Sequence, residues 1–188
     1  MTRIISGSAR GRKLAVPKVG TRPTSDRARE GLFSTLLTLV DLRDARFLDL
    51  YAGSGAVGLE ALSRGASHAT FVESNPQAAQ VIRDNASHAH LAGVQVECRP
   101  VSAYLGQAPT HAFDVVFLDA PYELAVEADV ELLLEKGWVG PESVVCVERA
   151  TRRSTYAWPS GWEAIRERKY GEGTLWYASP AAGHAVVR

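Results

Sequence analysis

The 188-residue chain has few cysteines, no long apolar run and no net charge. Its two cysteines, Cys98 and Cys146, are too few and too far apart for a disulfide framework or a zinc site. No apolar stretch approaches the roughly 20 residues that span a bilayer, and the opening MTRIISGSARGRK has no apolar signal core. These absences argue against a disulfide scaffold and a membrane helix. They predict a cytoplasmic protein with two reduced core thiols.

The absence of net charge conceals an uneven distribution of basic residues. Eight basic residues and Asp26 alone fall within the first 29 positions, so this segment carries +7 and the remainder −7. A basic segment on a mildly acidic body favours a polyanionic partner, with a merely solvated surface as the alternative. The candidate contacts are Arg10, Arg12, Lys13, Arg22 and Arg27.

The first 44 residues predict a small appendage to the main fold. Residues 3–6 and 13–16 resemble two short strands around a Gly-rich basic turn. Ser25 or Asp26 can then cap a helix, because the apolar residues that follow recur at helical spacing. We therefore divide the chain into a basic appendage at 1–44, a main domain at 45–180 and a tail at 181–188.

From about residue 45 the hydrophobic pattern alternates between strand-like and helix-like segments. This alternation predicts a parallel sheet with right-handed crossovers. Near the end, residues 162–169 and 174–178 predict two antiparallel strands joined by a Gly-rich turn. The other predicted strands are 46–50, 69–72, 95–98, 113–118 and 144–148, and the predicted helices are 57–64, 76–91 and 123–136.

A glycine motif follows the first strand of the main domain. Gly53, Gly55 and Gly58 form G-x-G-x-x-G between a predicted strand and a predicted helix. In this context the glycines let the backbone approach a nucleotide-like ligand. Glu73 ends the next strand, where a carboxylate can accept hydrogen bonds from both ribose hydroxyls. Together these features predict a nucleoside-binding site.

An acidic residue before the glycines indicates which nucleoside binds. Asp49 lies four residues before Gly53 and faces the same predicted pocket. Its charge repels the pyrophosphate of NAD and attracts a cation. S-adenosylmethionine has no phosphate and carries a sulfonium and an ammonium group. Asp49 therefore favours S-adenosylmethionine as the cofactor.

The stretch FDVVFLDAPY ends a strand in an unusual way. The apolar run 113–118 predicts a strand buried on both faces. Asp119, Ala120, Pro121 and Tyr122 follow it, at the edge where open α/β sheets bind ligands. A dehydrogenase needs no such sequence there. Together with Asp49, this segment favours a methyltransferase.

DLYAGSG followed by an Asp-x-Pro-Tyr strand end resembles the class I methyltransferases that modify exocyclic amines. The segments RIISG, RGRKL, RPTSDRARE and GLF resemble more narrowly the RsmD family, which methylates guanine N2 in 16S ribosomal RNA. The match runs over nearly the whole chain. It departs at Ala120, where that family has a proline. The resemblance implies a Rossmann-like, seven-stranded α/β fold with an antiparallel C-terminal strand pair.

The strand-end residues have a chemical purpose in such an enzyme. A guanine N2 amine is a poor nucleophile because its lone pair is delocalised into the ring. The Asp119 carboxylate and the carbonyl of Ala120 or Pro121 can accept its two N–H groups, aligning the lone pair and stabilising the positive charge that develops. Tyr122 can stack on a flipped base.

The resemblance also implies further cofactor contacts and a partner. Tyr51, within the glycine segment, is expected to contact the cofactor, and Val101 and Ser102 are expected to contact its adenine. The implied partner is 16S rRNA, within a small-subunit particle, for a monomeric enzyme. His88 and His90 do not share a helical face, so no metal site is expected. The alternatives are an adenine-N6 methyltransferase, a noncatalytic RNA-binding or assembly protein and, more distantly, an NAD-dependent oxidoreductase.

Overall fold

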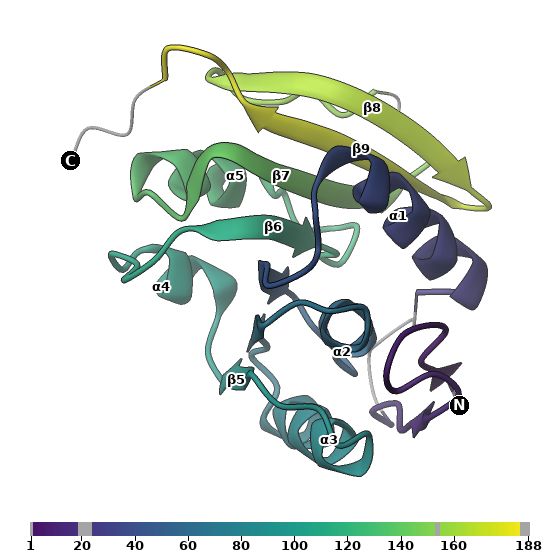
Figure 1. The fold of residues 1–188 in the computed structure, drawn as a ribbon. Helices are drawn as coiled ribbons and strands as arrows, with labels where there is room; N and C mark the ends of the chain where they lie inside the picture. Colours follow the sequence, from purple (N-terminus) through teal and green to yellow (C-terminus); the bar gives the residue numbers. More distant parts are fainter. Residues whose placement is uncertain (1, 19–23, 153–154, 185–188) are drawn as a thin grey trace.

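A seven-stranded sheet with the order β5-β4-β3-β6-β7-β9-β8 forms the centre of the protein (Figure 1). The computed structural model describes residues 2–18, 24–152 and 155–184. Strands β3 to β7 are mutually parallel, and β9 runs antiparallel to both β7 and β8. The strands are β3 (Arg46–Leu50), β4 (His68–Val72), β5 (Val94–Glu97), β6 (Phe113–Leu118), β7 (Val139–Ala150), β8 (Trp162–Tyr170) and β9 (Gly173–Pro180).

Five helices cover the two faces of this sheet. Helices α1 (Asp26–Leu39), α2 (Ala56–Ser63) and α3 (Pro76–His88) pack on one face, and α4 (Val101–Leu105) and α5 (Glu127–Glu135) pack on the other. The central strands are apolar on both faces because both faces are covered. Within the described ranges, no helix is long and apolar enough to cross a membrane.

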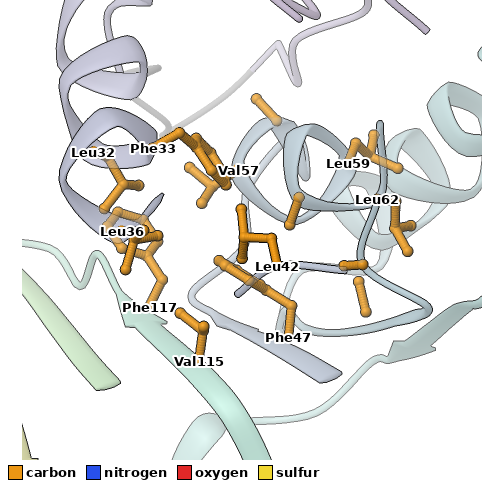
Figure 2. Packing of buried hydrophobic residues seen from close by; sticks show 14 of the residues in the cluster. Leu32, Phe33, Leu36, Leu42, Phe47, Val57, Leu59, Leu62, Val115 and Phe117 are labelled. Atoms are coloured by element: carbon orange, nitrogen blue, oxygen red, sulfur yellow. The ribbon is translucent and has the colours of Figure 1, made fainter. Parts of the chain in front are cut away.

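The core on the α1–α3 face joins the N-terminal region to the sheet. Leu32, Phe33 and Leu36 of α1 point toward Val57 of α2 and Phe117 of β6 (Figure 2). The same cluster contains Ile4, Ala9 and Leu14, which come from the first residues of the chain. The N-terminal segment thus shares its core with the sheet. The predicted boundary between residues 44 and 45 stays a prediction.

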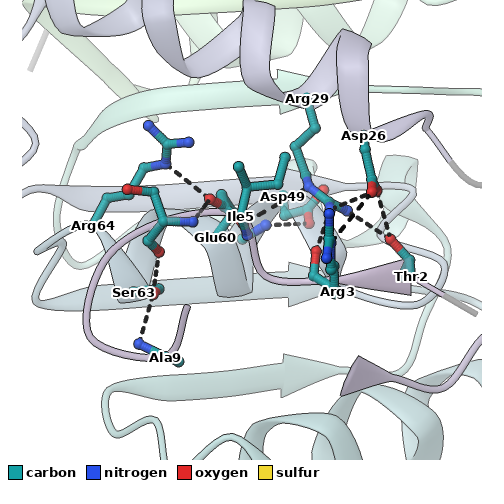
Figure 3. Close-up of polar contacts among 12 residues, drawn as sticks. Thr2, Arg3, Ile5, Ala9, Asp26, Arg29, Asp49, Glu60, Ser63 and Arg64 are labelled. Atoms are coloured by element: carbon teal, nitrogen blue, oxygen red, sulfur yellow. Dashed lines mark hydrogen bonds and ion pairs between the residues drawn. The ribbon is translucent and has the colours of Figure 1, made fainter. Parts of the chain in front are cut away.

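The N-terminal hairpin is held against α2 by polar contacts as well. Strands β1 (Thr2–Arg3) and β2 (Lys13–Leu14) form a separate two-stranded sheet, shorter than the predicted pair. The Glu60 carboxylate of α2 accepts the backbone N–H groups of Ile5 and Ser6 (Figure 3). These contacts fix the start of the chain on the outer side of α2, where it leads directly to α1.

The predicted fold class is confirmed, including the antiparallel C-terminal strands. β6 has the predicted bounds, and Ser25 caps α1 by accepting the N–H of Ala28. Three local predictions are wrong. The short helix α4 follows β5 and was not predicted, and α5 begins at Glu127 because residues 122–124 form a turn. Cys98 is exposed after the end of β5, whereas Cys146 is buried as predicted.

Candidate functional site

A cavity of about 580 Å³ opens at the carboxyl edge of the parallel strands. Residues that end neighbouring strands line it in the order of the sheet, with Glu73 after β4, Asp49 in β3, Asp119 after β6 and Glu148 in β7. Gly173 at the start of β9 continues this row. Ligands of open α/β sheets bind at this edge. The arrangement places Asp119 in the middle of the row.

The glycine loop is held from both sides by two of these carboxylates. Gly55, the residue before α2, has φ of 79° and no side chain to cap the helix. The Asp49 carboxylate supplies the cap instead, by accepting the N–H of Gly58 at 3.0 Å. Glu73 accepts the N–H of Gly53 at 2.9 Å and that of Asn75 at 2.9 Å. The two acids predicted to bind cofactor therefore also shape the loop.

Gly58 allows α2 to lie directly on the sheet. A Cβ at this position would lie 2.3 Å from the ring of Phe71 in β4. Any larger residue would push α2 away from β4 and displace the glycine loop. Gly58 and Gly55 do not line the cavity, whereas Gly53 does. The third glycine thus acts through packing.

Asp119 faces the cavity in a partly buried position. Its carboxylate accepts the hydroxyl of Thr24 at 3.3 Å, so the segment before α1 reaches the end of β6. Burial raises the pKa of the Asp119 carboxyl to about 6, while Thr24 and the charge of Arg149 lower it. Burial also raises the pKa of Asp49 well above its ordinary value, and the nearby Asp119 and Glu73 add to this effect.

The turn after Asp119 is held by an arginine that the sequence analysis did not identify. Arg149 is buried on the opposite face of β7 and donates to the carbonyl oxygens of Tyr122 at 3.0 Å and Leu124 at 2.7 Å. Nearby, the hydroxyl of Tyr51 donates to Asp129 at 2.5 Å. No local sequence signal indicated either contact, since both join residues more than 20 positions apart.

The cavity lining is strongly acidic. It carries five carboxylates, and the described lining residues include no Lys, Arg or His. The acids are Asp49, Glu73, Asp119, Glu148 and Glu172. Such a surface attracts a cation and repels a phosphate group. Although these acids share one cavity, no group of three or more His, Cys, Asp or Glu side chains in the described ranges is placed to hold a metal ion.

Most of the predicted strand-end and cofactor residues come together in this cavity. Tyr51, Asp49, Gly53 and Glu73 line it, as do the four candidate catalytic residues Asp119, Ala120, Pro121 and Tyr122. The structure does not bring Val101 or Ser102 to it. Val101 is buried at the start of α4, and Ser102 is exposed. Their predicted contact with adenine stays a prediction.

The basic residues of the N-terminal segment have different surroundings. Arg10, Arg12, Lys13 and Arg27 are exposed, and Arg22 lies outside the described residues. Arg29 also contributed to the predicted basic surface, but its side chain is fully buried. It donates to the Thr2 hydroxyl and the Arg3 carbonyl and lies 3.8 Å from Glu60 (Figure 3). Arg29 therefore anchors the N-terminus and is not available to a polyanion.

Comparison with known proteins places this architecture in a family. A sequence model described as Conserved hypothetical protein 95 matches residues 2–179. Ribosomal RNA small subunit methyltransferase D of Escherichia coli K12 is 38% identical over 172 residues, covering 90% of this chain and 85% of the relative. The protein of the same description from Haemophilus influenzae is 36% identical over 174 residues, covering 90% of this chain and 89% of the relative.

Solved structures agree with the sequence relatives. A structure described as the putative methyltransferase YhhF from Escherichia coli has a TM-score of 0.86 at 35% identity, covering 96% of this chain and 98% of that one. A more distant structure, SMU.776, is described as a putative methyltransferase complexed with SAH. It has a TM-score of 0.64 at 14% identity, covers 80% of this chain and 49% of that one, and shows the fold alone. By the extent of the family match and the identity to these relatives, the chain belongs to the Conserved hypothetical protein 95 family, the family of the RsmD proteins.

Proposed function

We propose that the protein transfers a methyl group from S-adenosylmethionine to the exocyclic N2 amine of a guanine in the 16S rRNA of the small ribosomal subunit. It acts in the cytoplasm as a monomer. Membership of a family whose curated relatives are rRNA methyltransferases supports the reaction class and the substrate. The acidic cavity, with Asp119 at its centre, is the observation that carries the proposal for this chain.

The charge of the cavity supports S-adenosylmethionine over a dinucleotide. Asp49 and Glu73 lie beside the glycine loop, and the described lining offers no basic side chain to a pyrophosphate. S-adenosylmethionine supplies an electrophilic methyl group on a sulfonium. The Glu73 carboxylate retains lone pairs for ribose hydroxyls in addition to its two backbone donors. The raised pKa of Asp49 reflects a buried carboxylate that a nearby cation would stabilise.

The loop after β6 supports transfer to an amine. Asp119 is positioned by Thr24, and the backbone that follows it is held by Arg149 through the carbonyls of Tyr122 and Leu124. In the proposed reaction, Asp119 accepts an N–H of the amine and directs its lone pair toward the methyl carbon. After transfer, the nitrogen loses one proton, which leaves to Asp119 or to water. The rigid loop keeps these acceptors in place.

Methylation of unmodified small-subunit particles tests this function. Purified protein is incubated with 30S particles that lack the modification and with labelled S-adenosylmethionine, and the modified nucleoside is identified by mass spectrometry. We expect N2-methylguanosine at one position of 16S rRNA. N6-methyladenosine would instead establish the adenine-N6 alternative, and RNA binding without transfer would establish a noncatalytic protein.

Calorimetry tests the cofactor independently of the RNA. S-adenosylhomocysteine should bind and NAD should not. Glu73→Ala should weaken binding by about 1.5–3 kcal/mol, the usual contribution of a hydrogen bond to a charged group. Glu172→Ala serves as the matched control, because Glu172 is an exposed acid of the same cavity on the far side of Asp119. Comparable affinities for NAD and S-adenosylhomocysteine would contradict the cofactor assignment.

A further inference from the structure

The cavity has an acidic residue next to Asp119 that the proposed reaction does not yet use. Glu148 lies on β7, which pairs directly with β6. The last register pair between these strands is Leu118 with Val147, and Asp119 and Glu148 are the next residue on each strand. Both side chains line the cavity. The two carboxylates therefore stand side by side at the edge of the sheet.

The two carboxylates also share one face of the sheet. Phe117 and Cys146 precede Asp119 and Glu148 by two positions, and both are buried in the core beneath α1 and α2. Because side chains alternate between the faces of a strand, Asp119 and Glu148 project on that same side. Arg149, one residue later, reaches the opposite side and holds the loop backbone. The alternation thus assigns Glu148 to the cavity and Arg149 to the loop.

The β9 end of the cavity is narrow enough to hold a planar base against these groups. A Cβ on Gly173 would lie 2.8 Å from a carboxylate oxygen of Glu148 and 3.6 Å from the hydroxyl of Tyr122. Glu148 and Tyr122 therefore approach the same point of the wall, and glycine leaves room for both. Glu73 and Asp49, beside the glycine loop, lie on the other side of Asp119 along the sheet edge. The cavity has two ends with Asp119 between them.

We infer that Glu148 selects guanine by accepting its N1–H while Asp119 accepts an N–H of the N2 amine. This inference rests on the proposed function and identifies the residue that determines its base specificity. Guanine carries N1–H and N2–H donors on adjacent atoms of its Watson–Crick edge. Two carboxylates on strands about 4.8 Å apart match such a pair of donors. A carboxylate has about four lone-pair sites, so Glu148 can accept N1–H in addition to its contacts within the protein.

The same carboxylate rejects adenine. Adenine has an unprotonated N1, whose lone pair would face the Glu148 oxygen atoms. A site built to accept a hydrogen bond discriminates strongly against a ligand that offers a lone pair in its place. Asp119 alone does not make this distinction, because adenine N6 and guanine N2 are both exocyclic amines. In this arrangement Asp119 serves the amine and Glu148 serves the ring nitrogen beside it.

A base analogue separates specificity from general damage to the site. 2-Aminopurine keeps the N2 amine of guanine but has an unprotonated N1. Once the methylated guanine has been mapped with the wild-type protein, particles are reconstituted with 16S rRNA that carries guanine or 2-aminopurine at that position. The ratio of kcat/KM for the two RNAs is then measured for the wild type, Glu148→Gln and Glu172→Gln. Intrinsic reactivity of the two bases cancels when ratios are compared between variants.

We expect the wild type to prefer guanine by about 10- to 100-fold, the range for one hydrogen bond to a charged group. Glu148→Gln should narrow this preference at least tenfold, because its amide can donate to the unprotonated N1 of 2-aminopurine. Glu172→Gln should keep the wild-type ratio. S-adenosylhomocysteine affinity, measured by calorimetry, should be the same in all three proteins and shows that the cavity remains folded.

Two results would overturn the inference in distinguishable ways. If the wild type methylates guanine N2 and Glu148→Gln keeps the wild-type preference, Glu148 does not select the base, and the proposed function stands. If the wild type places no methyl group on guanine N2, the proposed function fails and the inference fails with it. Glu148→Asp is a second variant that retains the acceptor, and it should preserve the preference for guanine over 2-aminopurine.

Discussion

The outer surface of the N-terminal hairpin and the cavity at the sheet edge have opposite charge. The hairpin exposes Arg10, Arg12 and Lys13, whereas the cavity is lined by five carboxylates. The two regions are connected through a short piece of chain, because Val16 and Thr24 already line the cavity. An RNA backbone is attracted to the first region and repelled by the second. This separation favours a complex in which phosphates stay outside and only an uncharged base enters.

The comparison also divides the basic residues of the N-terminal segment into two kinds. Exposed ones such as Arg27 lose little on contact with water and are available to phosphates. Arg29, two residues later, is buried among Thr2, Arg3 and Glu60. Net charge along the sequence therefore overstates the surface available to RNA. Four experiments address the contrast, beginning with the largest expected effect.

Arg29→Met should destabilise the protein by about 3–5 kcal/mol, because it removes one partner of a buried ion pair. The matched control is Arg27→Met, which changes an exposed arginine on the same helix and should stay within about 0.5 kcal/mol of the wild type. Urea unfolding at pH 7 measures both. Equal midpoints for the two variants would show that the buried and exposed arginines do not differ in role.

Asp119→Ala should lower kcat for methyl transfer by about 10²–10³-fold, since it removes an acceptor that acts chiefly in the transition state. The affinities for S-adenosylhomocysteine and for RNA should stay close to those of the wild type. Single-turnover transfer to small-subunit particles measures the first quantity, and calorimetry and filter binding measure the others. Near-normal turnover would mean that another group holds the amine.

Asp119→Asn should stabilise the free protein at pH 8 by at most about 3 kcal/mol, and should have little effect near pH 3.5. Burial raises the pKa of this carboxyl from 3.8 to about 6, so its contribution to stability is present below pH 4 and is lost as the pH rises through 6. Asparagine does not ionise and avoids this loss. Thermal unfolding of both proteins across this range gives the comparison, and a difference that does not change with pH would contradict it.

Replacing Arg10, Arg12 and Lys13 with alanine should have the smallest effect on the protein itself. It should flatten the dependence of log RNA affinity on log salt by about two, at roughly 0.7–0.9 for each phosphate contact. Cofactor affinity should change little, because these exposed side chains do not line the cavity.

A control triple variant carries alanine at exposed basic positions outside the N-terminal segment, namely Arg83, Lys136 and Lys169. Its salt dependence should match that of the wild type. If both triple variants flatten the slope equally, the N-terminal hairpin has no special role in RNA binding. If neither does, its positive charges are only solvated.

The parts of the site that could be predicted from sequence are those with local signals. The apolar run of β6 and the polar residues after it gave both the strand and the catalytic candidates, because strand period and chain order fix where a strand ends. The spacing of Gly53, Gly55 and Gly58 after a strand likewise located the loop now found beside Asp49 and Glu73. In each case neighbours in the sequence are also neighbours in the structure.

Other features were decided only by the tertiary structure. Thr24 meets Asp119 across 95 positions, and Asn85 joins Ala15 to Ser54 by hydrogen bonds to both. No local pattern encodes such pairings, because each depends on how the helices pack on the sheet. The same is true of charge: Arg27 and Arg29 are alike in sequence, and only the fold buries one of them. The chain order thus determined the sheet and its functional edge, whereas packing determined which charged groups face the cavity, the solvent or each other.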